Sequence, residues 1–167
     1  MKKKRKIFII TIACIILVMY MIGMSIFHIK FIQYMNPDAI TYLSRNWEIN
    51  IPEPNKIEKI YNREFPEGED LEIWHYEEKS IREIIDNNRF KEIDEQNKEF
   101  VLQKIDSYYG VLDDDEERLF NEYVNIESLV REENYFAFNT DKSNEASWIL
   151  LILDYKTGKL YYFVNVY

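Results

Sequence analysis

Carboxylates are the most abundant reactive side chains of this 167-residue chain, which has 30 Asp and Glu against 21 Lys and Arg. The densest group runs from Asp113 to Glu117 and reads DDDEE. Carboxylate oxygens bind Ca²⁺, but an EF-hand loop places its ligands at alternate positions around a central glycine, and this run has neither feature. A helix start fits better, with Asp113 as the N-cap, Glu116 as its capping-box partner, and the acids at the positive end of the helix dipole. The cluster therefore predicts a helix and not a metal site.

His75 is the only histidine in the part of the chain that we expect to form a domain, because His28 lies beside an N-terminal apolar segment. A catalytic triad needs a serine next to a histidine, but no serine here lies in a Gly-x-Ser-x-Gly setting. No His-Glu-x-x-His pair is present to bind zinc. A lone histidine on a strand is typical of a packed side chain, so we expect no catalysis from it. The serines considered are Ser80, Ser107, Ser128, Ser143 and Ser147.

Composition argues against three further chemistries. Two carboxylates can cleave a glycosidic bond, but 30 acids form so many pairs that the sequence indicates none of them. Only Gly68, Gly110 and Gly158 follow the apolar segment, too few for a glycine-rich phosphate loop. The single cysteine, Cys14, lies within that segment, so the rest of the chain has no disulfide, thiolate ligand or thiol nucleophile. We therefore expect no catalytic residue, no metal and no cofactor.

The C-terminal segment carries the pattern that most favours binding. Side chains alternate along residues 160–167, so Tyr161, Phe163 and Tyr167 lie on one face of a strand. Three rings on one face suit a partner protein or a sugar-like ligand. The alternative is that a helix or loop covers them, or that they form an ordinary cross-strand ladder, because large apolar patches are seldom left exposed. These three residues are the candidate partner-binding face.

The apolar periodicity predicts elements in the order β-β-α-α-α-β-β-β, which is typical of an α+β domain. We expect one mainly antiparallel sheet packed against helices on one face. The run from Trp148 to Leu153 has no polar face and should form a central strand covered on both sides. Gly158 ends a five-residue turn and is expected to close a hairpin in the left-handed conformation. The expected strands are 56–63, 70–76, 134–139, 147–154 and 159–167, and the expected helices are 95–109, 114–124 and one that begins with a capping box at Ser80 and ends at Asn87.

The 21 positions of residues 7–27 carry no charge and follow a basic run at positions 2–6. At about 1.5 Å per residue, such a helix is roughly 31 Å long, the thickness of the hydrocarbon core of a bilayer. Because the cations precede the segment, the positive-inside rule places the N-terminus in the cytoplasm. We expect a cytoplasmic tail at 1–6, a transmembrane signal-anchor helix at 7–27 in the cell membrane, a stalk at 28–55 and an extracytoplasmic domain at 56–167.

Two other fates of the N-terminus remain open. A cleaved signal peptide has a shorter apolar region of roughly 7–15 residues, and Gly23 to Ser25 match its cleavage site only weakly. The sequence from Thr11 to Cys14 loosely resembles the lipobox of bacterial lipoproteins, although mostly apolar residues follow Cys14. All three fates put the domain on the same side. The stalk should contain a short helix over 37–44 and an extended, proline-containing spacer at 51–55.

The exported part is strongly acidic. It contains all 30 acids but only 16 of the 21 bases, because five bases precede residue 7, and its net charge is therefore −14. Such a domain is a poor partner for nucleic acid. We expect a non-catalytic, membrane-anchored binding domain that meets a protein partner at the cell surface. The alternatives are a carboxylate-dependent hydrolase acting on cell-envelope material, and an immunity or inhibitor protein whose acidic surface neutralises a basic partner.

Overall fold

The computed structural model describes residues 39–62, 68–87, 89–142 and 144–166. The predicted membrane segment at 7–27 and Cys14 lie outside these residues. Within the described ranges, none of the helices has the length and apolar character needed to cross a bilayer. The chain divides into two compact units, Met1–Tyr42 and Leu43–Tyr167, and the fold that follows is that of the second unit.

Six strands form one sheet in the order β1-β2-β6-β5-β4-β3, and every neighbouring pair is antiparallel. The first hairpin and the last three strands therefore join one sheet, and the predicted α+β class is confirmed. The strands are β1 (Lys56–Asn62), β2 (Gly68–His75), β3 (Lys91–Glu92), β4 (Tyr135–Thr140), β5 (Trp148–Asp154) and β6 (Lys159–Val166). The helices are α2 (Ala39–Trp47), α3 (Glu78–Ile85), α4 (Lys98–Tyr109), α5 (Asp114–Tyr123) and α6 (Ile126–Leu129).

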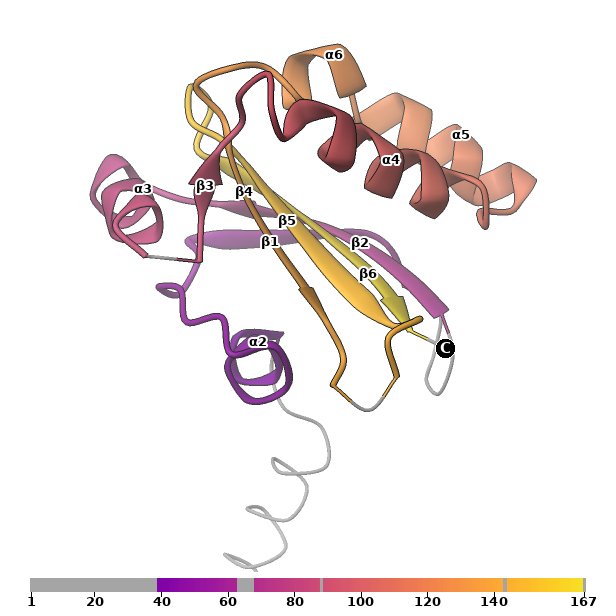
Figure 1. Cartoon of the computed structure of the whole chain (residues 1–167), viewed down its shortest axis with the longest axis horizontal. Helices are drawn as coiled ribbons and strands as arrows, with labels where there is room; N and C mark the ends of the chain where they lie inside the picture. Colours follow the sequence, from indigo (N-terminus) through magenta and orange to yellow (C-terminus); the bar gives the residue numbers. More distant parts are fainter. Residues whose placement is uncertain (1–38, 63–67, 88, 143, 167) are drawn as a thin grey trace, which may run out of the picture. The chain divides into compact units, whose positions relative to one another are not determined.

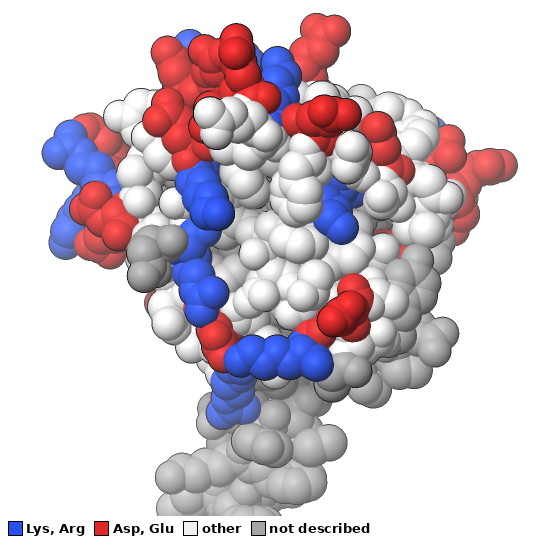
Figure 2. Space-filling view, viewed as in Figure 1, with Lys and Arg blue, Asp and Glu red and all other residues white. Residues whose placement is uncertain are grey.

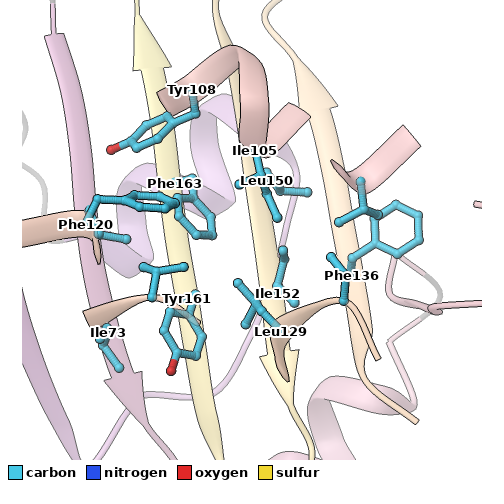
Figure 3. Close-up of a cluster of buried hydrophobic side chains, with 14 of the residues drawn as sticks. Ile73, Ile105, Tyr108, Phe120, Leu129, Phe136, Leu150, Ile152, Tyr161 and Phe163 are labelled. Carbon is cyan, nitrogen blue, oxygen red and sulfur yellow. The ribbon is translucent and has the colours of Figure 1, made fainter. Parts of the chain in front are cut away.

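Helices α4, α5 and α6 lie on one side of the sheet (Figure 1) and enclose the larger apolar core. Tyr108 of α4 meets the ring of Phe163 edge-on, with 5.3 Å between the ring centroids. Figure 3 shows how the rings of β6 and the aliphatic side chains of β5 point into the space between helices and sheet. The labelled core residues are Ile73, Ile105, Tyr108, Phe120, Leu129, Phe136, Leu150, Ile152, Tyr161 and Phe163.

The opposite face of the sheet is also covered, by residues that precede β1. The Asn139 side chain donates a hydrogen bond to the backbone oxygen of Trp47 (2.6 Å), and the Tyr76 hydroxyl donates one to the oxygen of Pro52 (3.0 Å). Asn139 and Tyr76 both point away from α4, because neighbouring residues of a strand face opposite sides. The expectation of helices on one face only is therefore incomplete. The buried residues of this covering segment are Leu43, Trp47, Ile49 and Ile51.

Strand β5 is buried along its whole length and lies between β4 and β6, as its apolar sequence predicted. Residues 150 and 152 face α4 to α6, while Ile149, Leu151 and Leu153 face the other layer. A strand with no polar side can be placed only where both of its faces are shielded from water. The central position of β5 is confirmed.

Local signals were predicted with mixed success. Asp113 accepts hydrogen bonds from the backbone of residues 115 and 116, and Glu116 completes the capping box, so the helix start at α5 is confirmed. The capping box at Ser80 is wrong, because the N-cap of α3 is Glu77, three residues earlier. Gly110 ends α4, but its φ of −68° is right-handed. The two-residue strand β3 and the one-turn helix α6 were not predicted, because neither is long enough to show a periodicity.

The hairpin between β5 and β6 depends on Gly158. Its φ is +67°, a conformation that residues with a β-carbon rarely adopt. A β-carbon placed there would lie 2.6 Å from the backbone oxygen of Tyr76, and the oxygen of Gly158 accepts a hydrogen bond from the Tyr76 N–H (2.9 Å). The glycine therefore joins the hairpin to the segment that follows β2.

Replacing Gly158→Val should destabilise the fold strongly. The strained φ alone costs about 1–3 kcal/mol, and the contact with Tyr76 adds to this cost. Thr157→Ala is the matched control: its side chain is exposed, and its backbone N–H keeps its bond to Asp154 (3.3 Å), so stability should change by less than about 0.5 kcal/mol. Urea unfolding measures both. Equal stability of the two variants would contradict the role of this turn.

Removing the residues before Lys56 should prevent folding, although the sequence analysis predicted that the domain begins at residue 56. Four buried apolar side chains would be lost, each contributing about 1.5–3 kcal/mol, against a typical total stability of about 5–15 kcal/mol. In the full chain, Trp47→Ala should cost about 3–5 kcal/mol, and the exposed control Asn46→Ala less than about 0.5 kcal/mol. A cooperative melt of the chain beginning at Lys56 would show that the covering segment is dispensable.

Candidate functional site

The two edges of the sheet differ in how well they are protected. Along β1, Lys56, Glu58 and Lys59 supply charges, and the register shifts between Lys59 and Tyr61. Charges and bulges of this kind stop an edge strand from pairing with another chain. At the opposite edge, β3 is only two residues long and covers no more than the first two residues of β4. Beyond these two residues, β4 has no neighbouring strand on this side within the described ranges.

The pairing of β4 with β5 shows which backbone groups face outward. The N–H of Asp141 donates to the oxygen of Ser147 (2.9 Å), so residue 141 faces β5. Backbone direction alternates along a strand, so Phe138 and Thr140 direct their N–H and C=O groups away from β5. The Thr140 N–H is bonded to the side chain of Asn139 (2.9 Å). Within the described ranges, the N–H of Phe138 and the carbonyls of Phe138 and Thr140 have no hydrogen-bond partner at this edge.

A pocket of about 590 Å³ lies beside this edge, on the side of the sheet that carries α4. Its apolar wall consists of Phe100 from α4 with Phe136 and Phe138 from β4, and the rings of Phe100 and Phe138 meet edge-on at 5.1 Å. Phe100 is 37 % exposed, so part of its ring can be reached from the pocket. We call this pocket and the outer edge of residues 138–140 the β4 groove. Its polar lining consists of Arg89, Lys91, Asp94, Gln96 and Asn97.

The turn before α4 fixes part of that polar lining. The Asp94 side chain accepts hydrogen bonds from the backbone N–H of Gln96 and of Asn97, at 2.9 and 3.0 Å. The Asn97 side chain accepts from the N–H of Asp94 (3.0 Å) and donates to the oxygen of Glu92 (2.9 Å). These groups hold the turn together, so the side chains best placed to meet a ligand are the rings and the cations.

Cations surround the apolar part of the groove. The ammonium of Lys104 lies 4.8 Å from the centre of the Phe138 ring, and no ion pair with Lys91 or Lys104 occurs among the residues that the structure describes. Arg89 lies 3.0 Å from Glu48. Figure 2 shows an uncharged area on this face with basic side chains on its left, right and lower borders, and acids above it and on both sides of the lower basic side chain. The groove is thus locally basic on an acidic domain.

Glu48 forms ion pairs with two of the cations beside the groove. Its carboxylate binds Lys142 as well as Arg89, and their charges hold the pKa of Glu48 below its ordinary value of 4.5, with Lys142 as the larger cause. The backbone of Glu48 has a φ of +55°, so the residue sits in a sharp bend directly after α2. The bend places one carboxylate between two cations that come from different segments.

Two of the three residues predicted as a binding face, Tyr161 and Phe163, lie away from this groove. Phe163 is fully buried and Tyr161 nearly so, and both belong to the core beneath α4 to α6 (Figure 3). Burial raises the pKa of Tyr161. Tyr167 lies outside the described residues. For Tyr161 and Phe163, the structure agrees with the alternative interpretation, in which helices cover the rings.

His75 and Glu58 form a small charged cluster with Lys56 at the edge of β1. In the described ranges, no three residues among His, Cys, Asp and Glu are grouped closely enough to hold a metal ion. Nε2 of His75 lies 3.3 Å from Oε2 of Glu58, an arrangement at the edge of β1. The pKa of Glu58 is lowered, first by Lys56 and then by His75. A general acid needs a raised pKa, so this carboxyl is tuned in the opposite direction.

The sequence did not indicate the β4 groove, because its parts come from separate segments. Phe100 and Lys104 belong to α4, Phe138 to β4 and Arg89 to the loop before β3. One signal was present: α4 carries Phe100 away from the stripe of its buried residues Val101, Ile105 and Tyr108. No protein-family model matches the chain, and no curated protein or solved structure is significantly similar to it.

Replacing Glu48→Gln should lower stability at neutral pH but not in acid. A carboxyl with a lowered pKa in the folded state stabilises the fold above its unfolded pKa, and this stabilisation disappears as the pH falls through the folded value. Urea unfolding at pH 7 and pH 3 should show a difference between wild type and variant that closes in acid. The exposed Glu53→Gln is the control, with equal stability expected at both pH values. A difference that persists at pH 3 would contradict the ion pairs.

Proposed function

We propose that this chain is a single-pass membrane protein that holds a non-catalytic binding domain outside the cytoplasm. Residues 7–27 would span the bilayer, and the basic residues at 2–6 would keep the N-terminus inside. The β4 groove would be the binding site. The single observation that carries this proposal is a strand edge with no paired strand beyond Phe136 in the described ranges, beside an aromatic pocket with a basic border. Soluble domains usually protect such edges, so an open edge favours a partner.

The two alternatives receive less support. A hydrolase that uses carboxylates would need two acids converging on a cleft, but among the described residues Asp94 is the only acid that lines the pocket. Its side chain is bonded to the backbone of its own turn. An inhibitor of a basic protein would present acids at its binding surface, whereas the border of the groove is basic. Binding of a protein partner agrees best with both the shape and the charge.

The proposal predicts a membrane protein of 20.4 kDa whose domain is reached from outside. Protease added to intact cells should digest the domain and leave the anchor. A photo-reactive residue in place of Thr140, at the groove, should cross-link to an extracytoplasmic protein in those cells, because the Thr140 backbone lies on the open edge.

The control for cross-linking is the same photo-reactive residue in place of Ile57, which is also exposed but lies on the protected edge β1. It should give no adduct. Mature protein that begins at Cys14 or Ile26 would overturn the anchor, and equal adducts from positions 57 and 140 would overturn the binding site.

A further inference from the structure

We infer that the β4 groove binds an extended, acidic segment of a partner protein, which pairs with β4 as an additional strand. This inference rests on the proposed binding function and names the chemistry of the partner. Peptides recognised in this way obtain affinity from main-chain hydrogen bonds and specificity from pockets that receive alternate side chains. Both parts of that mechanism are present at this edge.

The backbone of β4 supplies the first part. The N–H and C=O of Phe138 and the C=O of Thr140 face outward, two residues apart, as in a strand ready to pair. β3 already uses the neighbouring positions, since Lys91 pairs with Phe136. Before Lys91 the chain turns away: the N–H of Phe90 donates to the oxygen of Asn87 (3.0 Å). An added strand would therefore pair with β4 at residues 138–140, beyond the point where its pairing with β3 ends.

The pocket supplies the second part. Phe138 points toward α4, so a partner residue paired beside it would point the same way, toward the rings of Phe100 and Phe136. The volume of about 590 Å³ lies within the range of ligand pockets, roughly 300–1,000 Å³. A large apolar or aromatic side chain would bury the exposed part of Phe100. Every second residue of the partner would be read in this way.

Charge selects an acidic partner. Lys91 lies on the strand that the partner would extend, and Lys104 lies over the ring of Phe138. In the described part of the chain, neither lysine has a carboxylate partner, although acids outnumber bases in this protein. Carboxylates on either side of the anchoring side chain would pair with these lysines, and a basic segment would be repelled.

A second copy of this chain fits the edge less well. Pairing β4 with β4 of another copy would bring the two sets of basic side chains, each with Lys91 and Lys104, toward each other, and like charges at an interface disfavour it. An anionic membrane surface would meet the lysines but would leave the outward backbone groups of β4 unpaired. An acidic strand satisfies the charges and the backbone together.

The test uses the full chain in detergent micelles and a fluorescent synthetic peptide in which glutamate and valine alternate around one phenylalanine. Two further peptides serve as comparators: one has lysine in place of each glutamate, and one is acidic but N-methylated at alternate backbone positions. The acidic peptide should bind saturably and about tenfold more tightly than the lysine peptide. N-methylation should abolish binding, because it removes the main-chain donors.

Charge reversal then locates the site. Lys91→Glu combined with Lys104→Glu should reverse the preference between acidic and lysine peptides. Lys79→Glu combined with Lys156→Glu changes the net charge equally, on residues that do not line the groove, and should leave the preference unchanged. Unchanged melting of both double variants excludes loss of fold as the cause.

Several results would overturn the inference: no saturable binding of the acidic peptide, binding that survives N-methylation, equal binding of the lysine peptide, self-association of the chain through β4, or displacement of the peptide by phosphatidylglycerol vesicles. If one of these occurs while the cross-link from position 140 still captures a partner, the binding function stands and only the strand-addition mechanism is wrong. If that cross-link is also absent, the proposed function itself fails.

Discussion

Shielding β5 and β6 from water on both faces is the constraint on which the rest of this structure depends. Both strands are buried along almost their full length, and their apolar side chains point alternately to the two sides of the sheet. Helices α4 to α6 cover one side. The other side is covered in part by residues that precede β1, because the buried side chains of the segment from Leu43 to Ile51 pack there. The sequence predicted that this segment is a stalk outside the domain, but its buried side chains are part of the core.

The open edge of the sheet follows from how the chain enters α4. After α3 the backbone turns at Asn87, runs for two residues as β3, and turns again at Asp94 to begin the helix. So short a strand cannot cover six residues of β4. Phe100, in the first turn of this helix, meets the ring of Phe138 edge-on, and both rings line the pocket. The pocket and the free backbone groups therefore have one structural cause.

Sequence patterns predicted the elements that are long or strongly marked. The apolar strand at 148–154, the capping box at Asp113 and the left-handed Gly158 each depend on neighbouring residues, and each is present. β3 has two residues and α6 four, too few for a period to be visible. The burial of Tyr161 and Phe163 could not be predicted either. Their alternation in the sequence shows that they share a face of β6, but not that α4 to α6 cover this face. Alternation tells which residues share a face, and tertiary packing decides which face is exposed.

The basic border of the groove shows why overall charge is a weak guide to the chemistry of a binding site. The domain is acidic, yet the side chains around Phe138 include Arg89, Lys91 and Lys104. Glu48 is shared between Arg89 and Lys142, whereas Lys91 and Lys104 have no ion pair among the described residues. Acids elsewhere on the surface would repel an acidic partner at long range, but that repulsion is screened within about 8–10 Å at physiological salt, while contacts with the lysines are local. The short-range field at the groove therefore decides which segment β4 accepts, and the overall charge mainly affects how fast that segment arrives.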